Sequence, residues 1–286
     1  MSQDTIKLIE CPRDAMQGWG KFIPTEKKIQ YLDSLLKVGF DTLDFGSFVS
    51  ASAIPQMADT PQVITKLDIG NSKTKLLAII ANLRGAEEAA IYDEISYLGF
   101  PFSVSETFQQ RNTKSSIAES LKRVEAIQEL CKKKNKELVI YISMGFGNPY
   151  GDFYSEEIVF DWVNKLLQFD INIISLADTV GLATPEQVKS ITKHLIQSLP
   201  GKEIGVHLHS TSQNWEQKLK AAINAGCTRF DGALKGIGGC PMAGNDLVGN
   251  MDSLQMISYF RDNGFLQELD MNALEASKKM AEEIFI

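Results

Sequence analysis

The chain has 286 residues and a formal net charge of −7, from 29 basic and 36 acidic residues. Hydrophobic residues make up 44% and charged residues 23%, a globular composition that argues against a disordered or fibrous chain. The acidic balance argues against binding to nucleic acid or to a membrane surface. The N-terminus lacks a signal-peptide pattern, and no apolar run reaches the roughly 18 residues of a membrane span. We therefore expect a cytoplasmic protein.

The four cysteines lie far apart, with no paired spacing of the zinc-ribbon or redox kind. This spacing favours free thiols in a reducing compartment. The four are Cys11, Cys131, Cys227 and Cys240.

Short β-rich apolar runs alternate with helical stretches along the whole chain. Strands are predicted at Ile6–Glu10, Thr42–Gly46, Lys75–Ala81, Glu94–Leu98, Leu138–Ser143, Ile173–Leu176, Ile204–His209 and Arg229–Ala233. Helices are predicted at Thr25–Val38, Thr60–Leu67, Gly85–Tyr92, Ser115–Lys134, Ser155–Gln168, Pro185–Leu199, Asn214–Ala225, Asn250–Asn263 and Asn272–Ile284. Two of the helix starts carry cap signals, at Pro24–Glu26 and at Thr184–Glu186, and Gly39 is expected to close the first helix.

This alternation predicts a parallel sheet covered by helices. Eight repeats in fewer than 290 residues fit a (β/α)8 TIM barrel, typically about 250 residues long, with a doubly wound open sheet as the alternative. No glycine-rich linker or composition shift divides the chain, so we predict one domain over residues 1–286 with extra C-terminal helices. The longest connections follow the first, second, fifth and eighth strands and would gather at the C-terminal face of the barrel, where active sites lie.

Two of the three histidines alternate along the seventh predicted strand. His207 and His209 flank Leu208, so both imidazoles share one strand face. In a barrel this face is the lumen, while Val206 and Leu208 face the helices. The pair is either a metal site or two hydrogen-bonded core histidines. His194, on the preceding helix, is predicted to lie at the surface.

Acidic side chains cluster at the ends of several predicted strands. The first strand finishes in Glu10 and is followed by Arg13 and Asp14 at the same barrel mouth. Carboxylates with imidazoles suit Mg²⁺ or Mn²⁺, and zinc or iron(II) would also accept the set. Asp44 and Asp178 lie at the ends of the second and sixth strands, where solvated caps are the alternative reading.

The connection after the eighth strand is rich in glycine, from Lys235 to Pro241 and again at Gly249. Glycines let the backbone approach a ligand closely, and this region of a barrel commonly faces phosphate. Cys240 within it is either an acid/base group or an inert thiol.

Together these segments resemble the 3-hydroxy-3-methylglutaryl-CoA lyase family, within the metal-dependent lyases and condensing enzymes on TIM barrels. The matching stretches follow one another in order along nearly the whole chain. They are Pro12-Arg13-Asp14 with Gln17, Ser47–Ser50 with Pro55–Met57, Ser175–Gly181, Val206–His209, and Gly236–Pro241 with Gly249-Asn250.

The resemblance implies a divalent metal, Mg²⁺ or Mn²⁺, and a role for each matching residue. The implied ligands are Asp14, His207, His209 and Asn250. Arg13 would stabilise an enolate oxygen, and Cys240 would be an acid/base on its loop. The base that takes a hydroxyl proton would be Asp14, or alternatively His207.

The resemblance also implies three further carboxylates at the catalytic face. Asp178 matches directly, and Asp44 replaces a glutamate that is one methylene longer. Glu10 matches a family glutamate only if one residue is missing before Pro12.

The chain also departs from the family pattern. Ser210 stands where the family has aspartate after the second histidine. Ala15 replaces a glycine, Met242 replaces an aromatic residue, and the loop to Asn250 is one residue longer. Residues 143–149 replace a segment that carries cysteines in the family. The ligands are retained, so these departures bear on acyl-chain specificity.

The implied reaction is the cleavage of a hydroxymethylglutaryl thioester to acetyl-CoA and acetoacetate, in leucine catabolism or a related route. The expected partner is a small-molecule acyl-CoA, with a homodimer as the possible assembly. Two alternatives stay open, an acetyl-CoA:2-oxo acid condensing enzyme of the same superfamily and a non-catalytic metal-binding barrel.

Overall fold

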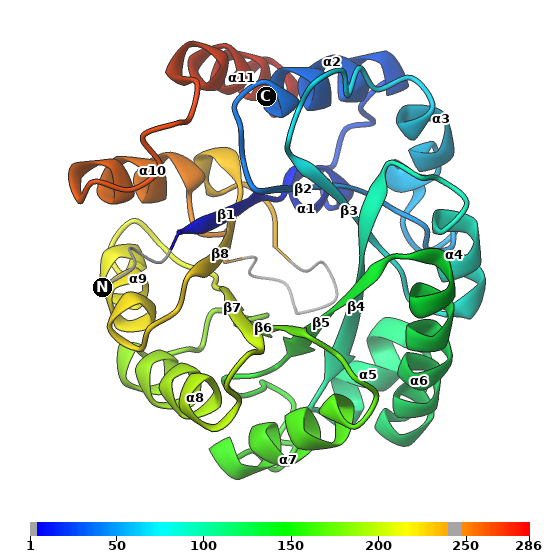
Figure 1. Ribbon diagram of the computed structural model, residues 1–286, viewed down its shortest axis with the longest axis vertical. Helices are drawn as coiled ribbons and strands as arrows, with labels where there is room; N and C mark the ends of the chain where they lie inside the picture. The colour runs from blue at the N-terminus through cyan, green and yellow to red at the C-terminus, as the bar shows by residue number, and fades with distance from the viewer. Residues whose placement is uncertain (1–4, 240–247) are drawn as a thin grey trace.

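Eight parallel strands close into a barrel in the computed structural model, which describes residues 5–239 and 248–286 (Figure 1). Each strand pairs with the next one in the chain, and the eighth pairs with the first. The strands are β1 (Lys7–Glu10), β2 (Thr42–Ser47), β3 (Lys75–Ile79), β4 (Ile95–Ser103), β5 (Glu137–Ser143), β6 (Ile173–Ala177), β7 (Glu203–His207) and β8 (Arg229–Gly232). The TIM-barrel prediction is confirmed, and the open-sheet alternative is wrong.

Helices surround the barrel and cover the outer face of the strands, except that the short α1 (Pro12–Gln17) lies inside this ring next to β1 and β2 (Figure 1). They are α1 (Pro12–Gln17), α2 (Thr25–Leu36), α3 (Thr60–Ile64), α4 (Leu83–Ala89), α5 (Glu106–Thr113), α6 (Ile117–Lys134), α7 (Glu156–Leu167), α8 (Pro185–Ser198), α9 (Trp215–Asn224), α10 (Ser253–Asp262) and α11 (Met271–Ile284), with 3₁₀ turns η1 (Pro55–Met57) and η2 (Leu234–Gly236). Within the described ranges, no helix is both long and apolar enough to cross a membrane.

The cap signals were read correctly at α8 and incorrectly at α2. Thr184 caps α8 and forms a reciprocal capping box with Gln187. Helix α2 instead starts after Pro24 with no side-chain cap, because the Thr25 hydroxyl donates to Asp59 at 2.7 Å. Gly39 follows this helix with a φ of +92°, the left-handed conformation expected of a closing glycine.

Several elements differ from the sequence prediction, and four of them bear on the site or its surroundings. Strand β4 continues to Ser103, through a Gly-Phe-Pro segment that resembles a loop. Two short helices, α1 and α5, occupy segments predicted as irregular. Helix α10 begins at Ser253 instead of Asn250, because Asp252 caps it and Asn250 forms a bridge with His209, two residues beyond β7.

The C-terminal helices close the ring next to the first β–α unit. Helix α11 lies beside α2 (Figure 1). The ring of Phe285 meets Trp19 and Tyr31 edge to face, with centroids 5.3 and 6.2 Å away. These apolar contacts, of the kind worth about 1 kcal/mol per aromatic pair beyond burial, attach the chain end to the barrel near the first β–α connection.

Side chains alternate between the barrel lumen and the helix layer. Val206 and Leu208 are buried in the main core under the helices, as predicted. The lumen holds a separate small apolar cluster of Leu77, Tyr97, Val139, Tyr141 and Ile173. Because these residues fill the interior of the barrel, they form an apolar floor beneath the polar residues at the barrel mouth.

Candidate active site

The turn after β1 brings Arg13 and Asp14 into the barrel mouth. The strand ends at Glu10, and Pro12 starts α1, where its fixed φ and missing N–H suit the first helical position. The two charged residues therefore lie on the first turn of a helix, not at a strand end as predicted. Both are buried, with exposed fractions of 7% and 5%.

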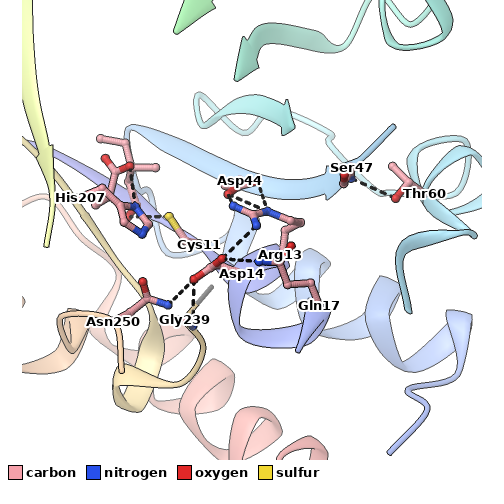
Figure 2. A network of polar contacts seen from close by, with 12 residues as sticks. Cys11, Arg13, Asp14, Gln17, Asp44, Ser47, Thr60, His207, Gly239 and Asn250 are labelled. Carbon is pink, nitrogen blue, oxygen red and sulfur yellow. Dashed lines mark hydrogen bonds and ion pairs between the residues drawn. The ribbon is translucent and has the colours of Figure 1, made fainter. Parts of the chain in front are cut away.

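Arg13 is bound between two carboxylates (Figure 2). Its Nε donates to Asp44 at 3.0 Å, its Nη2 donates to the same carboxylate, and its Nη1 donates to Asp14 at 3.0 Å. Burial raises the pKa of Asp44 to about 6, although the charge of Arg13 opposes the rise. Asp44 thus positions the guanidinium, and the solvated-cap reading of this residue is wrong.

Asp14 is the most heavily bonded carboxylate of the site. It accepts hydrogen bonds from Gln17 at 2.7 Å, from Asn250 at 2.7 Å and from the backbone N–H of Gly239 at 3.2 Å, besides Arg13 (Figure 2). Burial alone would raise its pKa, but the charges of Arg13 and the two imidazoles outweigh burial and lower the pKa to about 2. Asp14 is therefore an anion at neutral pH.

His207 and His209 meet Asp14 in the lumen. One potential ligand atom from each of these three residues lies within 4.8 Å of the other two. Burial, followed by the charge of His207, lowers the pKa of His209 to about 3 and leaves a neutral imidazole. Burial acts in the same direction on His207, but the hydrogen bond and charge of Asp231 outweigh it and raise that pKa.

Asn250 supplies an unused oxygen beside this cluster. Its Nδ2 donates to Asp14 at 2.7 Å and to the Ile237 carbonyl at 2.9 Å. Its Oδ1 is buried and has no partner among the described residues. A carboxylate, two imidazoles and a free amide oxygen form a donor set that fits a divalent cation.

The strand pairing explains why these four residues meet. His207 ends β7, and His209 forms an antiparallel bridge with Asn250 just beyond it. Asp14 comes from the other side of β8, because β1 and β7 both flank that strand.

Glu10 makes its hydrogen bonds outside this cluster. Its carboxylate accepts hydrogen bonds from the Leu234 N–H at 2.8 Å and from the Ser253 hydroxyl, in η2 and α10. Burial raises the pKa of Glu10 to about 8, partly opposed by these two bonds. Its catalytic role stays a prediction, since the structure does not bring it into contact with Asp14, His207 or His209.

Asp178 is held by a lysine that the sequence analysis overlooked. Lys218 of α9, 1% exposed, donates to Asp178 at 2.7 Å and to the His209 carbonyl at 2.8 Å. Asp178 also accepts the Ala183 N–H at 3.0 Å, so it is not a solvated cap. Lys218 thus connects the segments that follow β6 and β7. A catalytic role for Asp178 likewise stays a prediction.

Other sequence predictions meet mixed outcomes. His194 is exposed, as expected, and stacks on Phe160. Cys11, Cys131 and Cys227 are free, buried thiols. Cys240 and Met242 lie outside the described residues.

Sequence reasoning missed Asp231, whose carboxylate contacts His207. The available signal was a pair of charged residues on one face of a predicted strand, because Arg229 and Asp231 are two residues apart on β8.

The architecture defines a (β/α)8 barrel with a candidate divalent-metal site at its mouth. A family model described as HMGL-like matches residues 6–280, and the chain belongs to this family. Among similar proteins, the hydroxymethylglutaryl-CoA lyase YngG of Bacillus subtilis is 33% identical over 84% of this chain and 79% of its own length. The (R)-citramalyl-CoA lyase of Chloroflexus aurantiacus is 28% identical over 96% of this chain and 89% of its own.

A solved structure agrees with this assignment. An HMG-CoA lyase from Acinetobacter baumannii, in complex with coenzyme A and 3-methylmalate, superposes with a TM-score of 0.92. It is 30% identical, and the match covers 100% of this chain and 92% of that one.

Replacing Lys218 with methionine should strongly destabilise the fold. The change leaves the buried Asp178 carboxylate without its cation, a loss of about 3–5 kcal/mol in the free energy of unfolding, measured in urea. The double variant Lys218→Met/Asp178→Leu should recover much of the loss. Lys220→Met on the same helix breaks an exposed pair with Glu216 and a distant contact with the Tyr259 ring, and it should cost less than about 1 kcal/mol. Equal losses in the two lysine variants would contradict this assignment.

Replacing Glu10 with glutamine should flatten the dependence of stability on pH. The pKa of Glu10 is about 8 in the folded protein, above its usual 4.5. Its contribution to the free energy of unfolding is therefore fully present below about pH 4.5, and it is lost as pH rises toward 8. Urea unfolding of wild type and Glu10→Gln between pH 5 and 8 measures this slope. Glu275→Gln, at an exposed site, should keep the wild-type slope. A Glu10→Gln slope equal to wild type would refute the assignment.

Proposed function

We propose that this protein is a metal-dependent carbon–carbon lyase that cleaves 3-hydroxy-3-methylglutaryl-CoA to acetyl-CoA and acetoacetate. The observation that carries the proposal is the convergence of Asp14, His207 and His209 beside the Arg13 guanidinium at the barrel mouth. The reaction is a retro-Claisen cleavage. A base takes the proton of the tertiary hydroxyl, the carbon–carbon bond breaks, and its electron pair passes into a thioester enolate.

The proposed ligands are Asp14, His207, His209 and the Oδ1 of Asn250. A bound Mg²⁺ or Mn²⁺ would supply a Lewis acid that chelates the hydroxyl and a carboxylate of the substrate. The depressed pKa values of Asp14 and His209 favour the unprotonated forms that a metal needs.

Arg13 is proposed to stabilise the enolate oxygen. A guanidinium has five N–H groups, and three nitrogens of Arg13 already donate to Asp44 and Asp14. Its two terminal nitrogens each keep one N–H for a thioester oxygen. Because both carboxylates fix the guanidinium in place, it needs no reorganisation as charge develops.

Asp14 is proposed as the base, with His207 as the alternative. Asp231 occupies the Nδ1 of His207, so one ring nitrogen is left. That nitrogen can serve as a metal ligand or as a base, but not as both. Because the ligand set uses His207, the proton is assigned to a carboxylate oxygen of Asp14.

Cys240 is proposed to protonate the acetyl-CoA carbanion. The residue before it, Gly239, donates its backbone N–H to Asp14, and Asn250 on the far side of the loop contacts the same carboxylate. Both flanks of the loop therefore reach the site. We further propose one catalytic domain over residues 1–286, a cytoplasmic location and an acyl-CoA substrate.

The test is acetoacetate formation from hydroxymethylglutaryl-CoA in the presence of Mg²⁺ or Mn²⁺ and a thiol reductant. We expect EDTA to abolish turnover and added metal to restore it. Cys240→Ala should lower kcat by at least about 100-fold, the usual effect of losing a general acid. Cys131→Ala, at a buried thiol on α6, should keep most of the wild-type kcat.

Three results would redirect the proposal. Turnover that survives EDTA would remove the metal from the mechanism. Acetyl-CoA-dependent consumption of a 2-oxo acid without lyase activity would identify a condensing enzyme. Metal binding without turnover of any CoA thioester would identify a non-catalytic barrel.

Citramalyl-CoA is the second substrate to test. The citramalyl-CoA lyase of Chloroflexus aurantiacus covers nearly all of this chain, and Ser210 departs from the family pattern beside the second histidine. Citramalyl-CoA also carries a tertiary hydroxyl, so the same residues could act on it. A higher kcat/KM for citramalyl-CoA than for hydroxymethylglutaryl-CoA would change the assigned substrate and keep the reaction type.

A further inference from the structure

His207 lies between the proposed ligand cluster and a carboxylate at the back of the lumen. Its Nδ1 is 3.2 Å from Oδ2 of Asp231, and the two residues are register partners on β7 and β8. The Asp231 side chain is 0% exposed. The Asp231 side of the contact is therefore buried, while the His207 side chain remains 12% exposed toward the barrel mouth.

The contact constrains which nitrogen of His207 carries a proton. A carboxylate accepts hydrogen bonds, so Nδ1 must be the N–H donor and the lone pair of the neutral ring must lie on Nε2. We propose that Asp231 is a positioning residue that holds His207 in the Nδ1–H tautomer, with Nε2 presented to Asp14 and His209. The inference rests on the proposed metal site and extends it to a residue behind the ligands.

Neighbouring groups keep both partners in place. The ring of Tyr141 meets the His207 ring edge to face, with centroids 5.9 Å apart and planes at 87°. Arg229, on the same face of β8 as Asp231, is fully buried and donates to Glu203 at 2.9 Å. The charge of Asp231 is the main factor that raises the pKa of Arg229 against the effect of burial.

Arg229 lies near enough to Asp231 for their charges to interact, although no hydrogen bond joins the two side chains among the described residues. Its Nε and Nη2 have no hydrogen-bond partner among the described residues, and neither has Oδ1 of Asp231. A buried guanidinium near a buried carboxylate offsets part of the cost of burying either group.

Cys11 lies close to the same pair and offers a competing arrangement. One potential ligand atom from each of Cys11, His207 and Asp231 lies within 4.8 Å of the other two. A metal held there would take Nδ1 away from Asp231. This arrangement predicts metal binding that depends on Cys11, and such a result would overturn the proposal.

Nitrogen NMR of ¹⁵N-histidine-labelled protein tests the tautomer directly, because the chain has only three histidines. The measurement uses metal-free protein at alkaline pH, where the neutral rings are observed. We expect the Nδ1–H form for His207 in the wild type and a larger Nε2–H population in Asp231→Asn. Exposed His194 should be unchanged and serves as the internal reference. An Nε2–H tautomer in the wild type would overturn the proposal without any variant.

Mn²⁺ titration by calorimetry, without acyl-CoA, tests the consequence. Asp231→Asn should weaken Mn²⁺ binding by about 10- to 100-fold, the usual effect of losing a partner behind a metal ligand. Asp59→Asn is the matched control, because it removes a carboxylate paired with buried Lys28 at 2.7 Å, and the described contacts of that carboxylate, to Lys28 and Thr25, include none of the proposed ligands. It should leave Mn²⁺ affinity unchanged even if stability falls.

Each outcome separates this proposal from the proposed reaction. Wild-type affinity in Asp231→Asn, or loss of affinity in Cys11→Ala alone, would overturn the positioning role. Because neither measurement contains a CoA thioester, a failed lyase assay leaves both results valid. Conversely, lyase activity in a protein with an Nε2–H His207 would keep the reaction and reject the positioning role.

Discussion

The buried carboxylate of Asp14 is the interaction on which the site depends. It accepts hydrogen bonds from its own helix, through Arg13 and Gln17, and from both ends of the loop after β8, through Gly239 and Asn250. Burying an anion is costly unless such partners surround it. The requirement therefore ties the start of α1 to the last strand connection, and the same contacts place one oxygen-bearing side chain beside two imidazoles.

Charge balance extends this constraint through the rest of the barrel. The guanidinium of Arg13 is matched by two carboxylates above the apolar floor. Below the site, Arg229 faces Glu203 and lies near Asp231, and outside the lumen Lys218 holds Asp178. Buried ions paired in this way act as fixed electrostatic groups, so the site is organised before a substrate enters. Removing one partner of such a pair costs more than the pair contributes, because the other charge is left uncompensated.

The success of sequence reasoning followed from local periodicity. A period of two placed His207 and His209 on the lumen face, and the alternation of strands and helices predicted the barrel. It failed where local signals were absent or misleading. The Gly-Phe-Pro segment of β4 resembles a loop, and a six-residue helix such as α1 has too few residues to show a helical period. The α10 start was misplaced because a long-range bridge holds Asn250 in an extended segment.

The amino-acid sequence by itself determined the order of elements, the inward-facing histidine pair, and the types of the candidate ligand residues at the chain positions where the family places them. Tertiary structure alone decided which buried charges meet. Glu10 bonds to η2 and α10, Asp178 to Lys218, and Asp231 to His207, across 24 to 243 residues of chain. The physical reason is closure of the barrel, which sets β8 between β1 and β7. Distances across that closure depend on strand register and on the packing of the whole ring, and local sequence patterns carry neither.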